Sequence, residues 1–459
     1  MSGFSRSAEY HQPAFPFLTA LLLSCGFGVV LGISTLVSPL LSAALLAVFA
    51  LVYHLVIHPF RVSYLVLIAI IFTSAIPRNR IFPVLKINEI ILVLAMGWLL
   101  LPQKEPRRRA IILPGVPLVA SAILVVGTAI TPLVAYRMRG FSLSTSEILG
   151  LIAPIQYLCL FYFFALFPKN EAQRHQIIQL MWFLASIVAV IGLLQAARIG
   201  PVTAFLNRFY PSEHTIEAVE YGRLTSVFGA WNVFGAFLMS MLVMALAFQK
   251  YPRAPHYQLN LTVMVLLVLT CLLATNSYAS LIGLALSVVI LNLIQSHDKR
   301  LILYILLFIA VAAVILWPII SIRLADQFNS DSLVPQTIRY RFMVWEKFYI
   351  PMIQRSPLWG VSPNLDNVTF PYAESQYLYM AFHAGAISVA SHLVWAALLL
   401  GWLFGIARHG PELSRNLGAA TFTLLIVYSL MGITNPVFTY SGAIDIFWIS
   451  LGLIVNERI

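Results

Sequence analysis

Side chains that could do chemistry gather in residues 321–385, the longest interval without an apolar run able to cross a membrane. Arg339 and Arg341 stand near its middle and Glu374 near its end. A guanidinium stays charged and donates two parallel hydrogen bonds to a phosphate or carboxylate, whereas a carboxylate can accept a proton as a general base. These residue types favour a site that binds an anionic group and removes a proton.

Each of these residues also has a simpler interpretation. An Arg at a membrane surface pairs with lipid headgroups, and an acid at a helix N-terminus is stabilised by the helix dipole. The same choice arises in a second polar interval, residues 197–229, which contains Arg223. The apolar run that follows has Asn232 in its first turn. An Asn at this position often caps unpaired backbone N–H groups, so capping and ligand binding both stay open.

The elements that must position these side chains are membrane-spanning helices. With 60% hydrophobic and 10% charged residues, the chain has too little polar surface for a soluble globule of its length. The composition predicts one integral membrane domain, residues 1–459, with about 14 helices (range 12–14) of about 20 residues each. The expected spans are residues 17–36, 40–58, 62–77, 88–102, 114–134, 149–167, 177–196, 230–248, 259–275, 278–295, 301–320, 378–404, 417–434 and 440–455.

The short loops predict an orientation for this bundle. Basic residues cluster at 104–109, 250–253, 299–300 and 408–415, and such loops stay in the cytoplasm. Both termini are then cytoplasmic, and the large loop 321–373 and the second loop 197–229 lie on the external side. The many Arg residues in the external loops oppose this rule, so an anionic partner outside would account for them.

The large loop contains a predicted helix of its own. Apolar residues recur at Ile338, Phe342, Trp345 and Tyr349, which describes one stripe of a helix that ends near Pro351. A short helix with such a stripe and charges opposite is expected to lie in the membrane interface. Arg341 borders the apolar face, where it can meet a phosphate at the membrane surface.

The order of these residues resembles the O-antigen ligase and polymerase family, the Wzy/WaaL type of integral membrane glycosyltransferases. The resemblance covers roughly residues 190–405 and rests on four motifs. The matching residues are Arg223 with Asn232, Arg341 with Trp345, the turn Pro357 to Ser362, and Glu374, Ser375, Tyr377, Leu378 and Gly385. The sequence departs from the family pattern at Trp231 (Pro in the family), Tyr278 (Arg), Ser362 (Gly) and Glu374, where ligases usually place His.

The resemblance implies an all-α, GT-C-like fold with short interfacial helices in a large periplasmic loop. It implies transfer of a glycan from a polyprenyl diphosphate-linked oligosaccharide to a lipid-linked acceptor repeat unit, on the periplasmic face of the bacterial inner membrane. The acid at position 374 favours a polysaccharide polymerase, for O-antigen or exopolysaccharide, over an O-antigen ligase that uses lipid A core. A lipid-linked glycan flippase or secondary transporter is the alternative of another class, with Asp445 as an acid inside a span.

The implied enzyme is a metal-independent, inverting glycosyltransferase without a cofactor. Membrane lipids, a chain-length regulator and a flippase are its expected partners, and no nucleic acid is expected. Arg223 and Arg341 would clamp the leaving diphosphate, and Glu374 would act as general base. The expected substrate-binding residues are Asn232, Arg339, Trp345, Ser375 and Tyr377.

Overall fold

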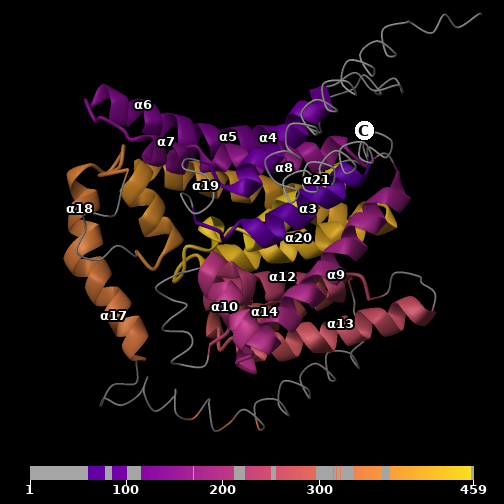
Figure 1. Ribbon diagram of the computed structural model, residues 1–459. Coiled ribbons are helices and arrows are strands. Elements are labelled where there is room, and N and C mark those ends of the chain that lie inside the picture. Colours follow the sequence, from indigo (N-terminus) through magenta and orange to yellow (C-terminus); the bar gives the residue numbers. More distant parts are fainter. Residues whose placement is uncertain are drawn as a thin grey trace, which may run out of the picture. The chain divides into compact units, whose positions relative to one another are not determined.

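The structure is a computed structural model that describes residues 60–77, 85–100, 115–168, 170–210, 223–249, 255–295, 335–363 and 373–455, with residues 314, 317 and 321. All its regular elements over these residues are helices (Figure 1). The chain divides into two compact units, Met1–Val62 and Ser63–Ile459. The helices below belong to the second unit, with α3 (Arg61–Thr73) beginning at the boundary. The expected spans 17–36 and 40–58, nearly all of 301–320, and the basic loops at 104–109, 250–253 and 299–300 lie outside the described residues.

Four of the described helical stretches are long and apolar enough to cross a membrane. They are Gly115–Met138, which comprises α5 (Gly115–Val125), η1 (Val126–Ile130) and α6 (Thr131–Met138), then α9 (Glu171–Ala196), α14 (Tyr278–Gln295) and α19 (Gln376–His409). Further helices that coincide with predicted spans are α4 (Ile87–Leu100), α8 (Ala153–Leu166), α12 (Trp231–Ala247), α13 (Pro255–Ala274), α20 (Glu412–Met431) and α21 (Ala443–Val455). The chain is therefore a helical membrane protein, while the total of about 14 spans stays a prediction.

Helices α12 and α21 form the centre of this unit. From Phe234 onward α12 is buried on every side, as is α21 along its described length. A helix that is apolar all round is stable only when other helices cover it, and α20 contacts both. Asp445, expected inside a span, instead lies in the first turn of α21, where its carboxylate accepts a hydrogen bond from the Gly442 N–H at 2.8 Å.

The helix of the large loop is longer than its sequence predicted. It runs as α17 (Gln336–Val344), the π-helical turn η3 (Trp345–Tyr349) and α18 (Ile350–Arg355). The expectation that it ends near Pro351 is therefore wrong. A proline clashes with the preceding helical turn and lacks an N–H, but the wider π-turn makes room for the ring. The same arrangement occurs where η1 precedes Pro132.

The packed face of this loop helix also differs from the predicted stripe. Phe342 is 57% exposed, whereas Val344 and Tyr349 are buried against Ala373 and Phe382. Phe342 and Val344 both lie in α17, before the π-turn, so the packed face of α17 is not the one that the stripe predicted. Only part of the stripe therefore faces the rest of the protein.

Helix α19 is broken at Gly385, whose φ of 74° and ψ of −177° are not helical. The turn that follows α18 crosses the break, with Val361 N–H donating to the Phe382 carbonyl and Ala386 N–H donating to the Pro357 carbonyl, both at 2.7 Å. Gly360 (φ 80°) sits against the backbone of His383 on the other side of the crossing.

Helix α6 supports the same crossing. The Tyr136 hydroxyl donates to the His383 carbonyl at 2.7 Å, and Arg139 Nη1 donates to the Gly360 carbonyl at 2.7 Å. Gly385 is buried, and backbone groups freed by a break in a buried helix need such partners, because an unpaired buried N–H or C=O is costly. The crossing fixes the short part of α19 before the break, residues 376–384, relative to α18.

Candidate active site

An ion pair joins two of the residues that the sequence singled out within residues 321–385. Arg341 on α17 donates from Nε at 3.0 Å and from Nη2 at 2.8 Å to the same oxygen, Oε2 of Glu374. The side chains are 23% and 37% exposed, respectively. Both groups are therefore fixed by each other and still reachable from outside.

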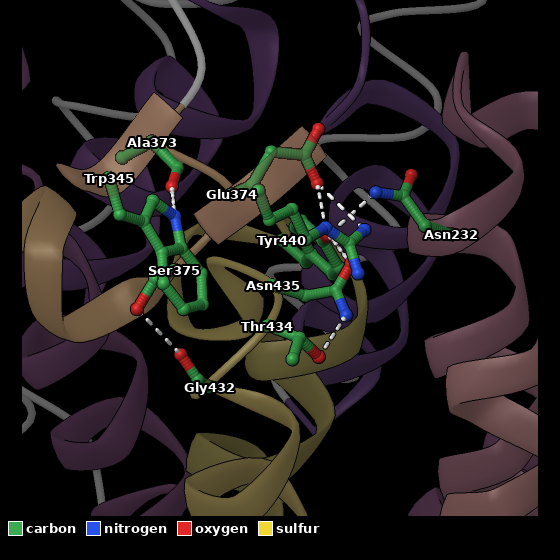
Figure 2. Close-up of polar contacts among 10 residues, drawn as sticks. Asn232, Trp345, Ala373, Glu374, Ser375, Gly432, Thr434, Asn435 and Tyr440 are labelled. Atoms are coloured by element: carbon green, nitrogen blue, oxygen red, sulfur yellow. Dashed lines mark hydrogen bonds and ion pairs between the residues drawn. The ribbon is translucent and has the colours of Figure 1, made fainter. Parts of the chain in front are cut away.

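The backbone of Glu374 adopts an unusual conformation. Its φ of 52° is in the left-handed region, which costs a residue other than glycine roughly 1–3 kcal/mol and is concentrated at functional sites. Trp345 holds the preceding residue, since its Nε1 donates to the Ala373 carbonyl at 2.7 Å (Figure 2). Arg341 and Trp345 lie on successive turns of one helix, so this helix holds both the side chain of Glu374 and the backbone before it.

The start of α19 is tied to the end of α20. The Ser375 hydroxyl donates to the Gly432 carbonyl at 3.4 Å, and the Gln376 N–H donates to the same carbonyl at 2.8 Å. The Tyr377 hydroxyl donates to the Ser429 carbonyl at 2.8 Å. Ser375 and Tyr377, expected to bind substrate, thus direct their hydroxyls to the backbone of α20, where they position Glu374.

A polar group from the C-terminal helices completes the surroundings of the pair. Tyr440, 6% exposed, precedes α21, and its hydroxyl accepts a hydrogen bond from Asn232 Nδ2 at 2.6 Å (Figure 2). It also contacts Asn435 Oδ1 at 3.5 Å. Burial raises the pKa of the Tyr440 phenol, the Glu374 carboxylate raises it further, and Arg341 opposes this. The phenol therefore lies within the field of the ion pair.

The sequence identified Asn232 but missed Tyr440 and Asn435. These two residues stand in a polar turn between two apolar runs, more than 60 residues after Glu374. Nothing in their local pattern links them to the large loop. The only sequence feature that pointed to this turn was the pair of polar residues, Thr434 and Asn435, at the end of a predicted span.

The remaining predicted residues lie around this cluster. The Arg223 guanidinium stacks on the ring of Trp231, 4.2 Å from its centroid, and Trp231 precedes Asn232 in the chain. Arg339 is exposed on α17, two residues before Arg341. Arg339 thus shares α17 with Arg341, and Arg223 contacts the first residue of α12, the helix that supplies Asn232.

The arrangement can bind an anion and accept a proton. Both bonds of Arg341 go to Oε2, so within the described part of the chain Oε1 of Glu374 makes no bond to a protein group. The same holds for Nη1 of Arg341 within those residues. An incoming hydroxyl can bind the free carboxylate oxygen, and an incoming phosphate the unused side of the guanidinium.

The fold and this cluster define a helical integral membrane protein with an Arg–Glu pair at the end of a broken helix. Residues 263–400 match the family model Wzy_C, described as O-antigen ligase. The match includes Arg341, Trp345 and Glu374, and it confirms the resemblance to the Wzy/WaaL-like family. It supports a ligase or polymerase type of function, a glycosyltransferase activity on lipid-linked oligosaccharides. No curated protein matches the chain.

Proposed function

We propose that this protein is a polysaccharide polymerase of the bacterial inner membrane. It transfers a glycan from a polyprenyl diphosphate-linked donor to a hydroxyl of a lipid-linked acceptor repeat unit on the periplasmic face. The observation that carries the proposal is the Arg341–Glu374 pair, with contacts of 3.0 and 2.8 Å to one carboxylate oxygen. It places a fixed cation beside a carboxylate that keeps one oxygen for a substrate.

The reaction is a single displacement at the anomeric carbon. The acceptor hydroxyl oxygen forms a bond to this carbon while the bond to the diphosphate oxygen breaks, so the configuration inverts. The acceptor proton passes to Glu374, and the bonding electron pair leaves with the polyprenyl diphosphate. Arg341 neutralises the charge that develops on this leaving group, the kind of interaction that is usually the largest electrostatic contribution to catalysis.

The other cations have supporting roles in this proposal. Arg223, stacked on Trp231, binds the second phosphate of the donor, and exposed Arg339 attracts the donor to α17. The planar guanidinium suits diphosphate because it donates two hydrogen bonds in fixed geometry. These side chains supply the positive charge, so the proposed mechanism requires no metal ion.

A ligase that transfers the glycan to lipid A core is the second candidate. The description of the matching family favours it, whereas Glu374, where ligases usually have His, favours the polymerase. A flippase is the candidate of another class. Asp445, the acid that suggested transport, makes a helix-start contact with Gly442, which is an ordinary structural role for an acid.

The test measures polymer length with purified protein and polyprenyl diphosphate-linked repeat units. Wild type is expected to extend the lipid-linked chain, and Glu374→Gln and Arg341→Ala to stop at one unit. Glu346→Gln and Lys347→Ala are matched controls, because they change exposed charges on the same loop helix, and they are expected to retain wild-type activity.

The alternatives give different results. Transfer to lipid A core rather than to a second repeat unit would establish the ligase. Absence of both transfers, with lipid-linked units accumulating on the cytoplasmic face of a deletion strain, would establish a flippase. Wild-type chain length in Glu374→Gln would remove the proposed general base.

A further inference from the structure

Tyr440 is the buried polar side chain beside the ion pair that the mechanism leaves without a role. Its backbone is fixed on both sides, because its N–H donates to the Val437 carbonyl at 3.0 Å and its carbonyl accepts from the Ile444 N–H at 3.1 Å. The ring is 6% exposed. A phenol held this rigidly presents its hydroxyl in one place.

Asn232 determines which hydrogen-bond role the hydroxyl has left. The Val233 N–H donates to Asn232 Oδ1 at 3.0 Å, which orients the amide so that Nδ2 faces Tyr440. The Asn232 Nδ2 donates to the phenol oxygen at 2.6 Å. The phenol is thus used as an acceptor, and its own proton remains to be donated.

The proton of Tyr440 has only a weak protein partner within the described residues. Asn435 Oδ1 lies 3.5 Å away, at the limit of a hydrogen bond. A ligand oxygen at normal hydrogen-bond distance would replace this contact at little cost. The phenol keeps its proton, because burial raises the pKa of Tyr440 and the negative charge of Glu374 raises it further.

We propose that the Tyr440 hydroxyl, positioned by Asn232, donates a hydrogen bond to a non-reacting oxygen of the acceptor sugar beside the hydroxyl that Glu374 deprotonates. This inference rests on the proposed function and assigns the recognition of the acceptor. One acceptor hydroxyl meets the carboxylate, which takes a proton, and a neighbouring oxygen meets the phenol, which gives one. Two contacts of opposite kind orient the sugar and make the site selective for a sugar that carries both oxygens.

The role predicts a particular kinetic signature. A contact to a non-reacting group is made in both the bound state and the transition state, so its loss raises KM and leaves kcat nearly unchanged. We expect Tyr440→Phe to raise the KM for the lipid-linked repeat unit about tenfold, the effect of one neutral hydrogen bond. Glu374→Gln is expected to lower kcat instead.

A double-mutant cycle with Asn232 tests the positioning. If Asn232 acts through Tyr440, Asn232→Ala raises KM by a similar factor and the double variant is no worse than Tyr440→Phe. Tyr210→Phe is the matched control, because Tyr210 is 4% exposed and its hydroxyl donates to the Phe72 carbonyl at 2.6 Å, outside this cluster. It is expected to keep the wild-type KM. Melting temperatures show that each variant is folded.

Three outcomes would contradict the roles proposed for Tyr440 and Asn232. Equal KM in wild type and Tyr440→Phe overturns the inference alone, provided that wild type extends the chain. Additive effects in the double variant overturn the positioning role of Asn232 and give it a contact of its own. Absence of transfer by wild type overturns the proposed function, and this inference with it.

Discussion

The geometry of the Arg341–Glu374 pair depends on the shape of the guanidinium as well as on its charge. Nε and Nη2 both bind Oε2, which turns the remaining nitrogen away from the carboxylate. A lysine at this position would carry the same charge as a single point without that planar arrangement. Geometry and charge can therefore be separated by substitution.

We expect Arg341→Lys to lower kcat at least about tenfold despite the retained charge, since one preorganised contact to developing charge contributes roughly 10²–10³ in rate. Arg355→Lys is the control, because Arg355 is exposed at the end of α18. The measurement is the initial rate of chain extension. A wild-type rate in Arg341→Lys would show that charge alone is sufficient.

For single residues, the order of the family motifs predicted which side chains belong together, and the local pattern around each residue did not. Arg341, Trp345 and Glu374 stand in the order that the family shares, and the structure brings them together. The substrate-binding role of Ser375 and Tyr377 stays a prediction, and in this structure their hydroxyls donate to backbone carbonyls at the end of α20. A sequence shows that a hydroxyl is available and does not show which carbonyl is nearest.

The crossing at Gly385 ties the part of α19 that follows Glu374 to the turn after α18. A Cβ on Gly385 would clash with the Leu358 carbonyl oxygen. Its φ of 74° with ψ near 180° is also a conformation that essentially only glycine adopts. The glycine that ends the last family motif is therefore required by the backbone.

We expect Gly385→Ala to lower the free energy of unfolding by at least about 3 kcal/mol, because the clash and the backbone strain act together. Gly401→Ala, in the same helix, is the control, as no atom lies within 4 Å of its added Cβ. Thermal unfolding in detergent compares the two. Equal melting temperatures would mean that the crossing can open without loss of the fold.

Elements were predicted well where one helix passes through apolar surroundings and poorly where a proline interrupts it. The expected span 278–295 coincides with α14. The loop helix continues past Pro351 because a π-turn precedes it, and such a turn has no sequence signature in the apolar periodicity. The break at Gly385 was equally invisible, since small and apolar residues continue on both sides of it as they would in an unbroken helix.

For the molecule as a whole, the positive charge at the C-terminal end of α19 predicts the orientation of this helix. Arg408 and His409 lie in its last turn, and Arg415 follows in α20. Basic residues close to the end of a span stay in the cytoplasm. The part of α19 after the break, residues 386–409, is roughly 36 Å long at about 1.5 Å per residue, enough to cross a hydrocarbon core of about 30 Å. Glu374 is then expected at the external membrane surface, where the diphosphate of the proposed lipid-linked donor would lie.

Cysteine labelling tests this orientation. In a variant with Cys25, Cys159 and Cys271 replaced, we expect Glu346→Cys to react with a membrane-impermeant maleimide in intact spheroplasts. His409→Cys is expected to react only after the membrane is opened. Both positions are exposed in the protein, so a difference between them reports the side of the membrane. If both react in intact spheroplasts, α19 does not cross the bilayer. The proposed donor, whose diphosphate is at the membrane surface, would then need another route to Arg341.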